Sequence, residues 1–186
     1  LQRVARIDTA CLQRRALQIE GTLNYHEGEL NTPAGEIGVI DVRGSGLLLF
    51  NGTAGASAMQ CSGGPCTLTI QNTGTIRRNT TAVVQLNLSA PLSNAGTVEL
   101  LAANTQIAGL TQSTGQTVIA AGASLESPLV TLTGGTLSGS GQIIGDLNNT
   151  GGTVRPQLPG VLSLSGNYTQ GAGATLEIEV GGTSPG

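Results

Sequence analysis

Few residues in this chain carry groups that could do acid-base chemistry, and the carboxylates among them are scattered. Asp8, Asp41 and Asp146 are the aspartates, and they stand far apart in the sequence. Glu177 and Glu179 would share one face of a strand, but no basic residue lies close to them in the sequence. Glycoside hydrolysis needs two carboxyl groups around the bond to be cleaved, and Ca²⁺ needs several oxygen ligands. These carboxylates therefore predict neither a catalytic nor a metal site.

The sequence offers one local polar group, formed by His26, Glu27 and Glu29. We interpret it as a solvated turn over residues 25–30. A phosphate-binding P-loop requires a lysine, and every basic residue of this chain is an arginine. A Gly-x-Ser-x-Gly nucleophile elbow at Ser140 would need a glycine two positions earlier, and that residue is Ser138. The sequence thus predicts a protein that is not an enzyme, without catalytic, cofactor-binding or metal-binding residues.

Three cysteines supply the remaining reactive side chains. Cys61 and Cys66 flank a short Gly-Gly-Pro turn, and we predict a disulfide between them in a secreted protein. A zinc site would need four ligands, and His26 is far away in the sequence. Cys11 is then unpaired, and it is either buried or forms an intermolecular bridge.

The amino-acid composition indicates what kind of fold carries these residues. The chain has 186 residues, 29 of them glycine, and its only aromatic residues are Tyr25, Phe50 and Tyr168. Such a chain suits a narrow, repetitive core of small aliphatic side chains. A net charge of -3 argues against nucleic acid as a partner. The longest aliphatic stretch, residues 47–50, is far shorter than the roughly 18 residues of a membrane-spanning helix, so we expect no membrane-embedded segment. We interpret the arginines as solvated faces or interface contacts, both near the N-terminus and at Arg77 and Arg78.

A repeated motif of glycine, threonine and an aliphatic residue, often preceded by asparagine, is the strongest pattern in the sequence. The threonines of the successive copies stand at positions 75, 97, 117, 136, 153 and 175. Between the copies, apolar and polar residues alternate in short runs that predict half-buried strands. Threonine is expected to face outward, and glycine and asparagine to stand at corners because they tolerate a positive φ.

This period predicts an all-β fold, a right-handed parallel β-helix (a β-solenoid) with about 20 residues per coil. Stacking such coils buries ladders of aliphatic side chains that one coil could not bury alone. A β-sandwich and a β-propeller are the rival folds. A propeller blade needs about 40 residues or more, and a sandwich would show tight two-residue hairpin loops.

We divide the chain into three parts. Residues 1–20 form an N-terminal cap or interaction segment, in which Val4, Ile7, Cys11 and Leu12 have the spacing of a short amphipathic helix that would cover the first coil. The alternative is an extended segment that contacts a neighbour. Residues 21–182 form the solenoid, with longer and less regular coils before residue 70. Residues 183–186 are a turn sequence, and the start at Leu1 indicates a piece of a longer protein.

Residues 68–182 resemble the β-helical repeat regions of large bacterial surface proteins, such as autotransporter passengers and filamentous-haemagglutinin-like adhesins. Three segments carry the resemblance: 68–78, 133–141 and 166–180. It implies a scaffold at the bacterial cell surface or outside the cell, and it supplies no catalytic motif. Residues 1–67 do not share it.

The sequence therefore favours a non-enzymatic, structural or adhesive solenoid, acting as a stalk or as a filament-forming subunit. Its expected partners are further copies of itself, stacked end to end with Cys11 as a covalent lock, or a host or cell-surface component. In the second case residues 1–67 would make the contact. The alternative is a carbohydrate-binding or carbohydrate-active β-helix, a lyase or hydrolase.

Overall fold

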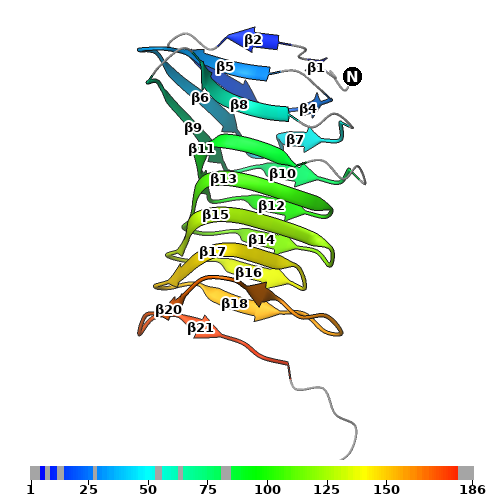
Figure 1. Cartoon of the computed structure of the whole chain (residues 1–186), viewed down its shortest axis with the longest axis vertical. Coiled ribbons are helices and arrows are strands. Elements are labelled where there is room, and N and C mark those ends of the chain that lie inside the picture. The colour runs from blue at the N-terminus through cyan, green and yellow to red at the C-terminus, as the bar shows by residue number, and fades with distance from the viewer. Residues whose placement is uncertain are drawn as a thin grey trace, which may run out of the picture.

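In the computed structural model the chain forms one column of stacked β-coils (Figure 1). The structure describes residues 5–6, 9–11, 15–26, 29–52, 56–62, 65–80 and 85–179. Among these residues every strand pairing is parallel, and no helix occurs. Each coil lays its strands beside the equivalent strands of the next coil. The predicted all-β parallel solenoid is therefore confirmed.

Sheet A forms one side of the column and receives one short strand from each coil. In each strand alternate residues point into the column, as in β7, where Leu48 and Phe50 are buried. The described strands pair in the order β1 (Ala5–Arg6), β4 (Thr22–Tyr25), β7 (Leu47–Phe50), β10 (Thr75–Arg78), β12 (Thr97–Leu100), β14 (Gln116–Ile119), β16 (Thr136–Gly139), β18 (Thr153–Pro156) and β21 (Thr175–Leu176).

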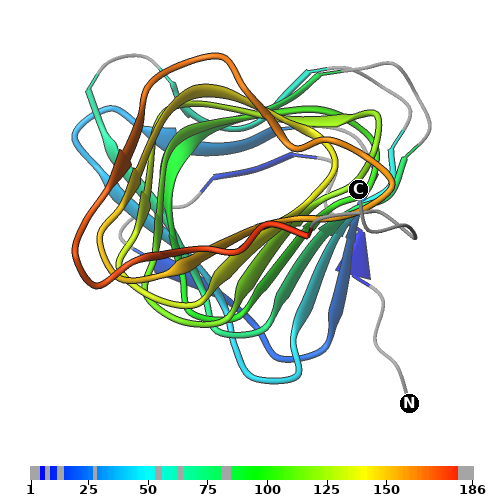
Figure 2. The same ribbon diagram turned by 90° about the horizontal axis from the view of Figure 1, so that it is seen from below.

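Sheet B provides the other two sides, so the coils seen along the column outline a rounded triangle (Figure 2). In the first coils each side has its own strand. One side is formed by β2 (Thr9–Cys11), β5 (Glu29–Pro33) and β8 (Ala56–Ser62), and the other by β3 (Arg15–Ile19), β6 (Ile37–Val42) and β9 (Thr67–Asn72).

In the middle coils one long strand bends around the corner and serves both of these sides. These strands are β11 (Leu86–Asn94), β13 (Ala103–Gln112), β15 (Ala123–Leu132) and β17 (Gln142–Asn149). The bend coincides with a shift of the pairing register, between Leu88 and Pro91 in β11 and between Glu126 and Leu129 in β15. In the last coil the two sides separate again into β19 (Ser163–Leu164) and β20 (Tyr168–Gln170).

The strand register measures the length of each coil. Along sheet A the buried residues Leu23, Leu48 and Ile76 pair in register, and the coils between them are the longest in this column. After Ile76 the coils are shorter, and the same column continues through Val98, Thr117, Leu137, Val154 and Leu176. The predicted length of about 20 residues per coil is confirmed. The longer coils come before Ile76, as expected.

The predicted position of one repeat threonine, Thr117, was wrong by a single residue. Gln116, and not Thr117, pairs with Thr97 and Thr136 in the outward column of sheet A. Thr117 points into the column, where it is fully buried and its hydroxyl donates to Gln112 Oε1 at 2.6 Å. A buried hydroxyl needs such a partner. The sequence motif alone could not distinguish the two positions, because both neighbouring residues are polar.

Asparagine and glutamine form a buried ladder at the corner that leads into sheet A. Asn72 Nδ2 donates to Asn94 Oδ1 at 2.8 Å, and Asn94 Nδ2 donates to Gln112 Oε1 at 3.0 Å. Each amide also donates to a backbone carbonyl of the following coil, that of Thr97, Gln116 or Thr136 respectively. The expectation that asparagine stands at corners because it tolerates a positive φ is wrong, since these asparagines have ordinary φ values and join successive coils by hydrogen bonds.

A column of glycines lies just before the strands of sheet A: Gly46, Gly74, Gly96, Gly115, Gly135 and Gly152. A side chain at these positions would meet the backbone of the preceding coil. A Cβ on Gly96 would lie 2.3 Å from the carbonyl oxygen of Gly74, and one on Gly115 would lie 1.9 Å from that of Gly96. Glycine is therefore required by the close approach of two chains. In the last coil Ala174 takes this place in the sequence.

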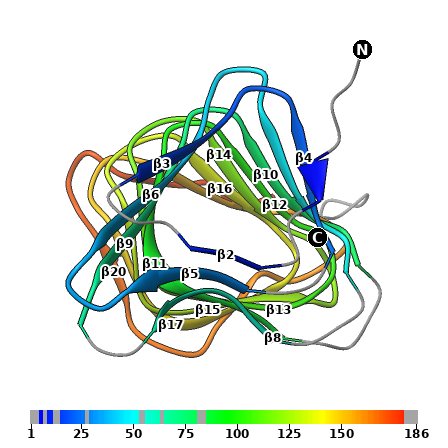
Figure 3. The ribbon, with the colours of Figure 1, turned by 90° about the horizontal axis from the view of Figure 1, so that it is seen from above.

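The predicted N-terminal helix is wrong for the part of residues 1–20 that the structure describes. Strands β1, β2 and β3 pair in parallel with β4, β5 and β6, and so continue the solenoid. The edge of the next coil offers backbone hydrogen bonds to an extended segment, and Leu17 and Ile19 follow the inward positions of Ile40 and Val42. Ala5 and Ala10 stand at the register positions of Leu23 and Leu30. Seen from above, β2 lies inside the outline of the coils below it (Figure 3).

Candidate functional site at the C-terminal end

The last coil is one of the two open ends of the described column. Its strands β19 and β20 pair with β17, and β21 pairs with β18, each on one side only among the described residues. The opposite edges present backbone N–H and C=O groups in the orientation of a parallel sheet. In the middle coils the equivalent strands have neighbours on both sides.

The inward side chains of this coil are much more exposed than their equivalents one coil earlier. Ile143, Leu147 and Val154 are 1%, 3% and 4% exposed. Their register partners Leu164, Tyr168 and Leu176 are half-buried, half-buried and 41% exposed, respectively. Ile178, two residues after the end of β21, is 65% exposed. The residue types are those of an interior coil, and their burial is that of a surface.

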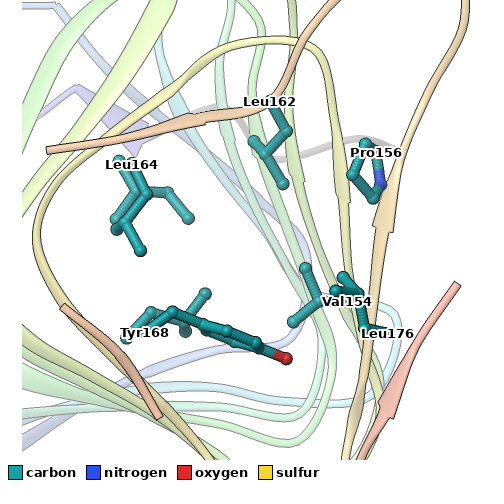
Figure 4. Close-up of a pocket in the computed structure, with 8 residues that line it drawn as sticks. Val154, Pro156, Leu162, Leu164, Tyr168 and Leu176 are labelled. Atoms are coloured by element: carbon teal, nitrogen blue, oxygen red, sulfur yellow. The ribbon is translucent and has the colours of Figure 1, made fainter. Parts of the chain in front are cut away.

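These side chains surround an apolar hollow of about 220 Å³, which we call the end hollow (Figure 4). Its inner wall belongs to the preceding coil, and its rim belongs to the last coil. It is lined by Ile143, Leu147, Val154, Pro156, Leu162, Leu164, Tyr168 and Leu176. Such a lining can hold aliphatic groups by burial, and it offers no charged group for catalysis or for binding an anion.

Tyr168 connects the end hollow to the buried amide ladder. Its hydroxyl donates to Gln170 Oε1 at 2.9 Å and lies 3.5 Å from Asn149 Nδ2. Asn149 also donates to the carbonyl oxygen of Thr175 at 3.3 Å and accepts from the backbone N–H of Gly152 at 2.9 Å. The Gln170 amide donates to Ala174 of its own coil, whereas the ladder amides of earlier coils donate to the following coil. The amide column is interrupted at Leu132, between Gln112 and Asn149, and ends at Gln170 among the described residues.

On the outer face of sheet A, two sets of arginine–glutamate contacts join successive coils. Arg77 pairs with Glu99 of the next coil, at adjacent register positions. Arg155 lies 3.7 Å from Glu177 and 3.0 Å from Glu179, both in the last coil. These two glutamates have no basic neighbour along the sequence. The stacking of coils brings Arg155 beside them.

The glutamate pair does not match the chemistry of a glycoside hydrolase. Such an enzyme needs one carboxyl group that donates a proton and a second one across the scissile bond. Here the Arg155 guanidinium contacts both carboxylates. Both side chains are also widely exposed, at 50% and 39%. The contacts are those of exposed ion pairs that join coils.

The other carboxylates that the sequence singled out remain apart from one another. Asp41 pairs with Arg43 at 2.5 Å, two positions away. Asp146 accepts from the backbone N–H of Asn167 at 2.8 Å, across to the last coil. Asp8 and Glu27 lie outside the described residues, and so does the side chain of Glu29, so the interpretation of the His26 group as a solvated turn stays a prediction.

The cysteines lie at the N-terminal half of the column. Cys66 is disulfide-bonded and packs against the core. The side chains of Cys11 and Cys61 lie outside the described part of the chain, although their backbones belong to β2 and β8. The pairing of Cys61 with Cys66, and the role of Cys11 as a buried or an intermolecular residue, both stay predictions.

The interpretation of Arg78 as a solvated or interface residue is wrong. Its neighbour Arg77 faces outward, but Arg78 is 3% exposed and stands in the inward column after Tyr25 and Phe50 and before Leu100. Burial lowers the pKa of the Arg78 guanidinium below its usual value. The alternation of β10 contained this signal, since Ile76 and Arg78 are two positions apart on one face.

Within the described ranges no group of three or more histidine, cysteine, aspartate or glutamate residues could hold a metal ion. The same ranges contain no helix that is long and apolar enough to cross a membrane. Comparison of the chain with models of protein families, with curated proteins and with solved structures found no significant match.

Proposed function

We propose that this chain is a non-enzymatic structural or adhesive segment of an extracellular bacterial surface protein, in which the solenoid acts as a stiff stalk. The observation that carries the proposal is the pair of ladders along the column. Buried amides join three successive coils through Asn72, Asn94 and Gln112, and glycines allow the coils to approach closely before the strands of sheet A. The residues of the repeat motif therefore serve to hold neighbouring coils together along the axis of the column.

Axial cohesion is the property that a stalk requires. In a solenoid each repeat contacts only its neighbours, so the stability of the rod is a sum of coil-to-coil contacts. The outer ion pairs Arg77–Glu99 and Arg155–Glu177 also run along the axis, as do the parallel backbone hydrogen bonds. The location at the cell surface is supported by the resemblance of residues 68–182 to bacterial surface solenoids.

The modularity of a stalk can be tested by deleting one coil in register. Residues 97–115 are one full coil, because Thr97 and Gln116 occupy equivalent register positions. We expect the shortened chain to keep its β-sheet circular dichroism, and small-angle scattering should show a rod shorter by about 4.8 Å. The matched control removes residues 97–106 only, which breaks the register, and should not fold.

Loss of folding in the register-preserving deletion would contradict a modular rod. The location is tested separately, on intact cells of the source bacterium. Antibodies raised against the purified chain should label unbroken cells, because a surface stalk is accessible from outside. Labelling only after the cells are lysed would overturn the surface location, and would leave the rod itself intact.

A further inference from the structure

We propose that the outer face of sheet A binds a neutral oligosaccharide, in a polar hollow in the middle of the column. The proposal deepens the adhesive role above and rests on it, since it names the class of ligand that an adhesive stalk would hold. Three observations carry it: the shape of the hollow, a buried hydroxyl group that lines it and the charge of its lining.

The hollow extends across four neighbouring strands of sheet A, β12, β14, β16 and β18 (Figure 1). We call it the sheet hollow. Its volume is about 460 Å³, and its polar lining consists of Thr97, Gln116, Thr136, Ser138, Arg155 and Gln157. The short side chains of Thr136 and Ser138 lie between the longer ones of Gln116 on β14 and Arg155 on β18, which gives the hollow its depth. Four strands cover about 14 Å, so the hollow is longer than one sugar ring.

Ser138 supplies a side chain that belongs to the outer face and is nevertheless buried. It pairs in register with the exposed Arg155, yet it is only 6% exposed. Within the described residues its hydroxyl makes no hydrogen bond, although it lines the sheet hollow. The group is already largely withdrawn from bulk water, so a ligand that offers it a hydrogen-bond partner gains free energy of binding.

The other uncharged groups of the lining are also available to a ligand. In the described part of the chain, the side chains of Thr97, Gln116, Thr136 and Gln157 make no hydrogen bond to the protein. Hydroxyl groups and amide groups both donate and accept hydrogen bonds. A sugar hydroxyl does the same, so it can pair with each of these side chains in either sense.

The charge of the lining favours an uncharged ligand. Arg155 is the one charged residue among the described residues that line the sheet hollow, and its guanidinium already contacts Glu177 and Glu179 of the following coil. An anionic ligand would have to compete with these two carboxylates for Arg155. A cationic ligand would find no carboxylate within this lining. The lining therefore suits a neutral saccharide better than an acidic one.

The position of the hollow within the sheet argues against a peptide strand as the ligand. Peptides that bind to sheets commonly add a strand at a free edge, where backbone groups lack partners. Strands β14 and β16 each have a neighbour on both sides. The sheet hollow therefore offers side chains to a ligand, and no free strand edge.

A glycan array tests the class of ligand. The purified chain is probed against neutral and acidic oligosaccharides, and the affinity of those that bind is measured by isothermal titration calorimetry. We expect neutral oligosaccharides to bind more tightly than their monosaccharides, with an affinity that added salt leaves unchanged, because no ion pair forms. Binding that is confined to acidic glycans, or no binding to any glycan, would overturn the proposal.

Two pairs of substitutions test the location. Thr136→Val removes a hydroxyl from the sheet hollow, and its control is Thr131→Val on β15, which is also half-buried but belongs to sheet B. Gln116→Ala removes an exposed amide, and its control is Gln142→Ala, at an exposed amide on β17 of sheet B. Each substitution in the hollow should weaken binding about fivefold, as expected for the loss of one hydrogen bond. The two controls should bind as the wild type does.

Equal affinity of all four variants would show that the glycan binds elsewhere and would overturn the site. Valine keeps the β-branched shape of threonine, and both glutamines are exposed, so the variants should fold, which circular dichroism would check. Failure of the glycan experiments is distinguishable from failure of the stalk role, because the coil deletion and the labelling of cells need no ligand.

Discussion

The middle coils and the last coil are built from the same residue types but differ in burial. In the middle coils, between Leu86 and Pro156, inward residues such as Leu125 and Leu137 are fully buried. In the last coil Leu164 and Leu176, which stand in the same columns, are half-buried and exposed. The difference lies in the neighbours, because within the described residues the last coil has a neighbouring coil on one side only.

This comparison shows where a solenoid keeps its stability. A coil cannot bury its own apolar face, so burial comes from the coil above and the coil below. The glycine column and the amide column at the corner before sheet A also change in the last coil. The glycine column of the middle coils gives way to Ala174, and the position of the buried Asn149 is taken by the exposed Gln170. The predictions below test this contrast, from the largest expected effect to the smallest.

The largest effect is expected where two middle coils approach most closely. Gly96→Ala would place a Cβ 2.3 Å from the carbonyl oxygen of Gly74, so the backbone of one of the two coils would have to shift. We expect a loss of about 4 kcal/mol in the free energy of unfolding, measured by urea denaturation. The matched control is Gly109→Ala in β13, where a Cβ would meet nothing within 4 Å. A similar loss in both variants would refute the glycine column.

The second effect compares the two regions in one column. Leu125 is fully buried, and Leu164 stands two coils later in the same column and is half-buried. Leu125→Ala should cost about 3 kcal/mol, because it leaves a closed cavity. Leu164→Ala should cost about 1 kcal/mol in the monomer, since half of its side chain already faces solvent. Equal losses at a concentration where the chain is monomeric would count against an open last coil.

The third effect concerns the buried amide ladder. Asn94 accepts from Asn72 and Gly96 and donates to Gln112 and Gln116. Asn94→Ala leaves several buried groups without a partner, so we expect a loss of about 2 kcal/mol. The control is Asn148→Ala, next to the buried Asn149 but half-buried on the outer face, which should cost less than about 0.5 kcal/mol. The ladder would be dispensable if the two losses were the same.

The smallest effect is a gain. Ala103 begins β13 and has a φ of 58°, in the left-handed region that only glycine adopts without strain. Ala103→Gly should therefore raise the free energy of unfolding by up to about 1 kcal/mol, partly offset by the greater freedom of glycine in the unfolded chain. A rise in the thermal midpoint would confirm the strain. A fall in the thermal midpoint would show that the packing of the Ala103 methyl group stabilises the chain more than the strain destabilises it.

The repeat itself could be predicted from the sequence, because the glycine before each strand of sheet A and the alternation within it leave a regular pattern. The register could not be fixed where the motif was loose, as at Gln116 and Thr117, since either residue could face outward. Arg78 was misjudged because charged residues rarely occupy inward positions. Its place in the alternation of β10 was the correct guide.

The two ends were harder to predict. The helical spacing in residues 1–20 competes with strand pairing, and only the open edge of the next coil decides in favour of strands. The partnership of Arg155 with Glu177 and Glu179 joins residues of two successive coils that are far apart in the sequence. Burial in the last coil depends on what covers it, so the residue types alone predict a buried Leu176 that the structure shows to be 41% exposed.

Amide hydrogen exchange under native conditions tests the central claim most directly, that each coil is held by its neighbours. The N–H of Thr97 bonds to Gly74 at 2.8 Å, and that of Glu177 bonds to Val154 at 2.9 Å, so the two bonds are alike in length. In the monomer Thr97 should exchange only by global unfolding, and Glu177 by local opening of the last coil, at least a hundredfold faster. Equal protection of the two amides in the monomer would contradict the account.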